Sequence, residues 1–145
     1  MSVVMAAMAA MGAAQAAPDA GACVAEHARV AEADGADAAR SAFASCARKA
    51  YGGAVEPRIE RCTGDLYTLP VILLYRGENL SKNAALADMK RDGQTDAATP
   101  EGRRALLMLD FAYQGAGPAN DPTETWLHQR TVQWTDRCLR GAVPK

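Results

Sequence analysis

Four cysteines constrain the fold of this 145-residue chain more than any other feature of its sequence. They form an even set without a C-x-x-C pair, namely Cys23, Cys46, Cys62 and Cys138. Redox-active thiols usually occur as C-x-x-C, and structural zinc sites usually combine closely spaced ligand pairs. Neither pattern is present, so we expect all four thiols to be structural and to form two disulfides.

Hairpin geometry narrows the three pairings that four cysteines allow. In two antiparallel helices, residues equidistant from the connecting turn face each other. Cys23 and Cys46 are equidistant from a turn at Asp34-Gly35, and Cys46 and Cys62 are equidistant from the next turn along the chain. If Cys23 bonds Cys46, the remaining bond is Cys62–Cys138. If Cys46 bonds Cys62, the remaining bond is Cys23–Cys138. The spacing alone leaves both sets open.

The first residues indicate an export signal. No charged residue occurs in residues 1–18, and the apolar run ends in Ala14-Gln15-Ala16, the small-x-small pattern after which signal peptidase cuts. We expect a signal peptide at residues 1–16 and a single helical domain at residues 17–145, located in the periplasm or secreted. Because no Lys or Arg precedes the run, we expect the true start upstream of Met1. The alternatives are a buried Ala-rich helix and a lipoprotein signal acylated at Cys23.

Charge and hydropathy exclude two classes of partner. The net charge is −1, with both signs mixed along the chain, whereas a nucleic-acid-binding domain usually carries a basic patch or stripe. No apolar run after the leader reaches the roughly 20 residues that a membrane-spanning helix needs. We therefore expect neither nucleic-acid binding nor a membrane span.

Apolar residues at helical spacing, separated by Gly, Pro and Asp, predict an all-α bundle of five to six helices stapled by the two disulfides. We expect helices at about 19–33, 37–51, 57–77, 81–93, 99–114 and 121–140. Expected N-terminal caps are Asp37, Ser81, Thr99 and Asp121. Pro70 is expected to kink or break the third helix, because proline cannot donate to the preceding turn.

The last helix has a clear core face in the sequence. Leu127, Thr131, Trp134 and Cys138 repeat at helical spacing, and the disulfide cysteine turns this face inward. We therefore expect Trp134 to be a buried anchor. Trp126 lies off this face, and we expect its replacement to have a milder effect.

The chain lacks the sequence patterns of common catalytic sites. It has no G-x-S-x-G, no H-E-x-x-H, no phosphate-binding loop and no C-x-x-C-H. We interpret His27 and His128 as exposed or capping histidines. The alternative for His128 is a haem ligand together with a methionine. Glu56 and Glu60 lie one helical turn apart, as a glycosidase pair would, but this spacing is typical of a solvated face. We expect no catalytic residue, metal or cofactor.

The segment Arg76-Gly77-Glu78-Asn79-Leu80-Ser81 is a polar cluster directly after the most apolar stretch of the chain. A helix stop followed by a helix cap explains every residue except Arg76. Arginine is over-represented among binding hot spots. We therefore name Arg76, Glu78 and Asn79 as candidate binding residues.

Four segments of the second half of the chain form a recognisable pattern: Cys62, the run Leu73–Ser81, then Phe111-Ala112-Tyr113, and finally Trp134-Thr135-Asp136-Arg137-Cys138. This pattern resembles that of small exported helical proteins of proteobacteria. In those proteins a cysteine-led helix ends in Arg-x-Gly-x-x-Leu-Ser, an Ala-Tyr pair follows, and a terminal helix ends in cysteine. The resemblance spans residues 62–139, slightly over half of the chain.

This resemblance implies a bond between Cys62 and Cys138 and a non-enzymatic character. The helix pair at residues 23–51 lies outside the pattern and would then carry its own Cys23–Cys46 bond. We expect an exported binding or inhibitor-type protein, such as an immunity factor, that acts on another cell-envelope protein. The alternatives are a small-ligand carrier with an apolar cavity and an envelope hydrolase that uses carboxylates. An exposed apolar patch would favour the binding or inhibitor-type protein. An enclosed apolar cavity would favour the carrier, and convergent buried carboxylates would favour the hydrolase.

Overall fold

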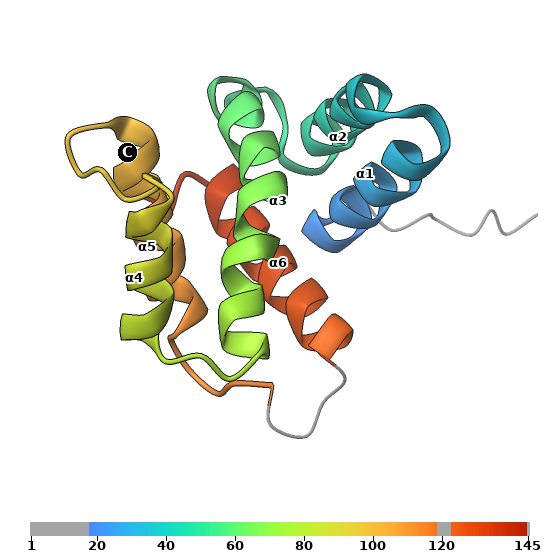
Figure 1. Ribbon diagram of the computed structural model, residues 1–145. Coiled ribbons are helices and arrows are strands. Elements are labelled where there is room, and N and C mark those ends of the chain that lie inside the picture. The colour runs from blue at the N-terminus through green and yellow to red at the C-terminus, as the bar shows by residue number, and fades with distance from the viewer. Residues whose placement is uncertain (1–17, 119–122, 145) are drawn as a thin grey trace, which may run out of the picture.

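The computed structural model describes residues 18–118 and 123–144 (Figure 1). These residues form six α-helices and one short 3-10 turn, with no strand among them, so the all-α prediction is confirmed. The leader expected at residues 1–16, and the cap expected at Asp121, lie outside the described residues. The elements are α1 (Ala20–Asp34), α2 (Ala36–Tyr51), η1 (Gly53–Val55), α3 (Glu56–Gly77), α4 (Lys82–Arg91), α5 (Pro100–Ala112) and α6 (Thr123–Leu139).

Two disulfides hold the helices in pairs. Cys23–Cys46 joins α1 to α2, and Cys62–Cys138 joins α3 to α6 across a sequence separation of 76 residues. The pairing that the resemblance implies is confirmed, and no cysteine is free. In the chain-entropy model the longer loop contributes about 4 kcal/mol by restricting the unfolded chain.

Helix α3 is the centre of the fold. It packs against α6, α5, α2 and α4, while α1 and α2 form a hairpin at one end of the molecule (Figure 1). Its buried residues follow helical spacing and meet the largest buried side chains of the other helices in one core cluster. The large fully buried side chains are Phe43, Val55, Leu69, Ile72, Leu73, Met89, Leu109 and Leu139.

Side-chain caps fix the starts of α4 and α5 as predicted. Ser81 Oγ accepts a hydrogen bond from the Ala84 amide at 3.1 Å, and Thr99 Oγ1 accepts one from the Gly102 amide at 3.0 Å. The Asp37 prediction is wrong, because Gly35 precedes α2 and Asp37 lies in its first turn. A single residue connects α1 to α2, and its φ of 89° suits glycine.

Of the kink or break expected at Pro70, the break does not occur, because α3 continues through Pro70 to Gly77. Proline costs a helix roughly 3 kcal/mol through its missing amide and its ring. Leu69, Ile72 and Leu73 on either side of it are at most 1% exposed. This tertiary burial holds the chain helical against the local preference.

Helix α6 buries more residues than its predicted core face. Trp134 is 4% exposed, as predicted, but Trp126 is 5% exposed, and its indole donates to the Ala116 carbonyl at 3.3 Å. The burial of Trp126 removes the basis for the milder effect expected of its replacement. The loop after α5 folds back over the start of α6 and covers Trp126, and the spacing within α6 alone does not reveal this contact.

Candidate functional site

The exposed side of α3 carries three large apolar side chains in one line. Tyr67, Val71 and Leu74 are 45%, 53% and 40% exposed, and their spacing places them on a single helix face. No other large apolar side chain in the described part of the chain is exposed to this degree. We call these three residues the α3 stripe. An apolar row that the core does not use is a feature of interaction surfaces.

His27 of α1 holds the first residue of this stripe. The Nε2 atom of His27 lies 3.1 Å from the hydroxyl of Tyr67, and the two rings meet edge to face with centroids 5.3 Å apart. The imidazole also meets Phe43 edge-on. His27 is only 7% exposed, so the prediction that it is exposed or capping is wrong, and burial lowers its pKa. By contrast, His128 is exposed, as predicted.

The guanidinium of Arg76 points into the protein and caps the C-terminal end of α5. Its Nη1 donates to the carbonyls of Ala112 and Gln114 at 2.9 and 3.0 Å, and its Nη2 donates to the Gly115 carbonyl at 2.7 Å. The rings of Tyr113 and Trp126 lie within cation–π distance. The expectation that packing does not require Arg76 is therefore wrong, because it satisfies backbone carbonyls that a helix end leaves unpaired.

Asn79 and Glu78 differ in what they do at the end of α3. Asn79 has a φ of 63°. The Leu80 amide bonds the Tyr75 carbonyl at 2.9 Å, and the Asn79 amide bonds the Arg76 carbonyl at 3.0 Å. These bonds form a Schellman motif, in which asparagine tolerates the left-handed conformation. Glu78 is exposed and makes no side-chain hydrogen bond to a described residue.

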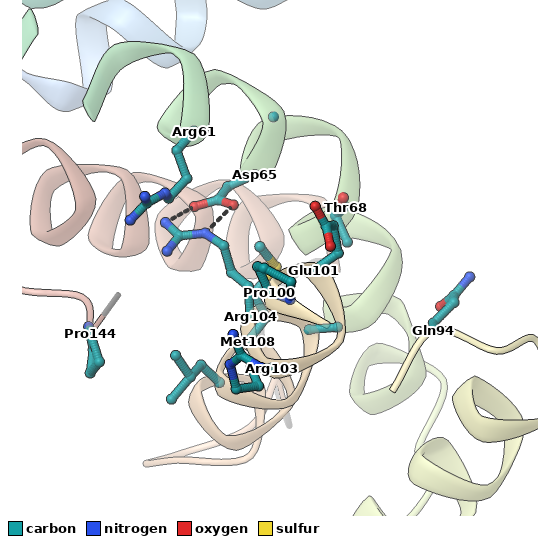
Figure 2. Close-up of a pocket in the computed structure, with 13 residues that line it drawn as sticks. Arg61, Asp65, Thr68, Gln94, Pro100, Glu101, Arg103, Arg104, Met108 and Pro144 are labelled. Atoms are coloured by element: carbon teal, nitrogen blue, oxygen red, sulfur yellow. Dashed lines mark hydrogen bonds and ion pairs between the residues drawn. The ribbon is translucent and has the colours of Figure 1, made fainter. Parts of the chain in front are cut away.

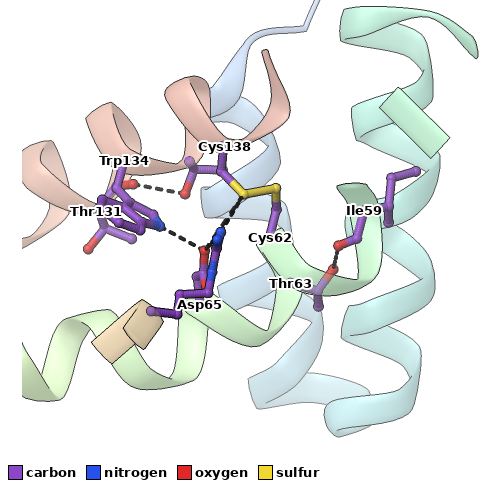
Figure 3. Close-up of polar contacts among 9 residues, drawn as sticks. Ile59, Cys62, Thr63, Asp65, Thr131, Trp134 and Cys138 are labelled. Carbon is purple, nitrogen blue, oxygen red and sulfur yellow. Dashed lines mark hydrogen bonds and ion pairs between the residues drawn. A yellow bond between two sulfur atoms is a disulfide. The ribbon is translucent and has the colours of Figure 1, made fainter. Parts of the chain in front are cut away.

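A buried ion pair lies beneath the Cys62–Cys138 disulfide (Figure 3). Asp65 accepts hydrogen bonds from Arg104 Nε and Nη2 at 2.7 and 2.6 Å, and from Trp134 Nε1 at 2.8 Å. The side chains of Asp65 and Arg104 are 5% and 14% exposed. Asp65 is thereby fully engaged in positioning Arg104 and Trp134.

A pocket of about 520 Å³ opens beside this ion pair (Figure 2). It lies between α3, α5 and the C-terminal tail, and its lining includes Ala105, Leu107 and Met108. Arg61, Arg103 and Arg104 bring positive charge to its wall. It is open and partly charged, and so differs from the enclosed apolar cavity expected of a carrier.

The described residues do not bring carboxylates together. Glu56 pairs with Arg48 at 2.7 Å on the exposed surface, and Glu60 is exposed. Asp65 is the one buried carboxylate in the described part of the chain. Nor do any three His, Cys, Asp or Glu side chains within residues 18–118 and 123–144 lie close enough to hold a metal ion.

None of the described helices is both long enough and apolar enough to cross a membrane. No protein-family model matches this chain, and no curated protein or solved structure shows significant similarity to it.

Sequence reasoning missed both the α3 stripe and the Asp65–Arg104 pair. A signal for the pair was present, since Asp65 follows Cys62 by three residues and so shares its buried face. The stripe had a signal too, because Val71 and Leu74 extend the apolar run of α3 around more than one side of the helix. One helix face suffices for a core, so the surplus indicates a second contact surface.

Proposed function

We propose that this protein is an exported, non-catalytic binding protein that docks onto another cell-envelope protein through the α3 stripe. The observation that carries the proposal is the row of Tyr67, Val71 and Leu74, each at least 40% exposed. An aromatic residue with two aliphatic neighbours is typical of the apolar centre of a protein interface.

The way Tyr67 is held supports its role in binding. Its hydroxyl is bonded to the buried His27 at 3.1 Å, so the ring keeps one orientation in the free protein. A residue that is already ordered loses little side-chain entropy when a partner binds. This makes Tyr67 the expected anchor of the contact.

The charges at the ends of the stripe indicate the chemistry of the partner. Glu60 lies about two helical turns before Tyr67, and Glu78 lies about one turn after Leu74. Both glutamates are exposed. Neither makes an ion pair with a described residue. We expect the partner to present an apolar groove with basic residues at its rim, because complementary charges steer association and fix the register of docking.

The residues that the sequence singled out take different parts in this proposal. Glu78 belongs to the rim of the surface. Arg76 and Asn79 do not belong to the contact surface. They fix the end of α3 and its contact with α5, and so hold the helix that carries the stripe in position. The two disulfides are compatible with an oxidising compartment such as the periplasm.

Photo-crosslinking in the producing cells tests this proposal. A benzophenone amino acid replaces Val71 in the stripe or, as a matched control, Ala87, which is exposed on α4. We expect position 71 to give one discrete covalent product with an envelope protein, and we expect the additional change Leu74→Asp to abolish it. The Ala87 position should not give this product.

Three outcomes would contradict the proposal. Position 71 could give no product, or it could give the same products as position 87. A product with the mass of two copies of this chain would mean that the stripe is a dimer contact.

A further inference from the structure

The pocket beside the Asp65–Arg104 pair has the volume and the lining of a small-molecule site. Its volume of about 520 Å³ falls within the roughly 300–1,000 Å³ that ligand pockets occupy. The lining combines apolar side chains of α5 with the arginines Arg61, Arg103 and Arg104 (Figure 2). The α3 stripe contributes no residue to this lining.

The charges in the pocket are not balanced. Arg61, Arg103 and Arg104 face Asp65 and Glu101, so the lining carries one net positive charge. Asp65 already accepts two hydrogen bonds from Arg104. Arg61 makes no ion pair or side-chain hydrogen bond with a described residue, and it extends on the same side of the Asp65 carboxylate as Arg104 (Figure 2).

Arg104 retains binding capacity in spite of its partner. Its Nε and Nη2 atoms bind Asp65, whereas its Nη1 atom makes no hydrogen bond to a described residue. Asp65 and the nearby ring of Trp134 hold the guanidinium in place. A guanidinium that is already fixed loses little side-chain entropy when it binds an anion.

We propose that this pocket binds a small organic monocarboxylate, with the carboxylate at Arg61 and Arg104 and an apolar body over Ala105, Leu107 and Met108. Guanidinium groups bind carboxylates strongly through charge-assisted hydrogen bonds. A single negative charge matches the net charge of the lining. A phosphate dianion would be disfavoured, because Asp65 and Glu101 repel additional negative charge.

An NMR titration of the isotope-labelled full chain with octanoate tests this site. The indole N–H of Trp134 donates to Asp65, so its signal should shift and saturate as octanoate engages Arg104. The indole N–H of Trp126 donates to Ala116 instead and serves as the internal control, whose signal should stay in place.

Variants and probe chemistry separate charge recognition from non-specific apolar binding. Arg61→Gln should weaken octanoate binding about threefold to tenfold, as expected for a charged contact near the surface. Arg40→Gln, an exposed position on α2, should leave it unchanged. Octan-1-ol and octyl phosphate should both bind more weakly than octanoate.

The proposal is overturned if octanoate gives no saturable shift of the Trp134 signal. It is also overturned if octan-1-ol binds as tightly as octanoate, or if Arg61→Gln has no effect, because the site then does not recognise the anion. Tighter binding of octyl phosphate would replace the monocarboxylate by a phosphate ester as the ligand class.

Discussion

The carboxylate of Asp65 on α3 and the guanidinium of Arg104 on α5 form a bidentate ion pair, with N–O distances of 2.7 and 2.6 Å. The pair is nearly buried, and Trp134 of α6 donates a third hydrogen bond to the same carboxylate. One side chain thus joins three helices. A buried charge is tolerated only while its partners remain.

Asp65→Asn should destabilise the protein by about 3–5 kcal/mol, because it leaves the Arg104 guanidinium buried without a counter-charge. Urea unfolding followed by circular dichroism measures this loss. The matched control is Asp110→Asn, which breaks the exposed pair of Asp110 with Lys82 and should cost less than about 1 kcal/mol. Equal, small losses for the two variants would mean that Asp65 does not organise the helix contacts.

Arg76→Ala should lower the free energy of unfolding by about 2 kcal/mol, because carbonyls at the end of α5 lose a charged donor. This replaces the expectation, drawn from the sequence, of an Arg76 that packing does not require. Arg76→Lys should be intermediate, since lysine keeps the charge but not the planar fork. Arg40→Ala on exposed α2 should stay within about 0.5 kcal/mol of the parent, and an Arg76→Ala as mild as this control would contradict the capping role.

Trp126→Ala and Trp134→Ala should each cost about 3–5 kcal/mol, as expected for large buried side chains. The two tryptophans are 5% and 4% exposed, so the structure gives no reason for one replacement to destabilise the protein less than the other. Thermal or chemical unfolding of the two single variants makes the comparison. A loss below about 1 kcal/mol for Trp126→Ala alone would show that the loop after α5 does not cover it in solution.

His27 should make stability depend on pH. Burial lowers the pKa of the His27 imidazole in the folded state. In the unfolded chain the pKa of a histidine side chain is about 6.5. Below that value the unfolded state binds more protons, so the free energy of unfolding should fall as the pH drops from about 7 toward the folded-state pKa. His27→Gln should flatten this slope below about pH 7. An unchanged slope in His27→Gln would contradict the buried neutral imidazole.

Local signals in the sequence predicted the helices well where the cause is itself local. Ser81 and Thr99 cap the following helices because their hydroxyls reach amides three residues ahead. Hairpin symmetry allowed two sets of disulfides, and the resemblance implied the set that the structure has, Cys23–Cys46 with Cys62–Cys138. The caps need little knowledge of the rest of the fold.

Long-range contacts explain the predictions that are wrong. Arg76 caps carbonyls that lie 36 or more residues later in the chain. Trp126 contacts the loop after α5 and the guanidinium of Arg76 on α3, both distant in the sequence. Pro70 remains helical because burial of its neighbours outweighs its local cost. The candidate site was missed for the same reason, since only the packed fold shows which face of α3 is left over.

Equilibrium binding to the crosslinked envelope protein, once it is purified, tests the central claim most directly. We compare the parent chain with Val71→Asp in the α3 stripe and with Ala87→Asp on exposed α4. Burying a new carboxylate in an apolar contact should weaken binding more than about tenfold, or about 1.4 kcal/mol, while the melting temperature stays close to that of the parent. Ala87→Asp should change the dissociation constant less than about twofold. Equal affinities for all three chains would contradict the α3 stripe as the binding surface.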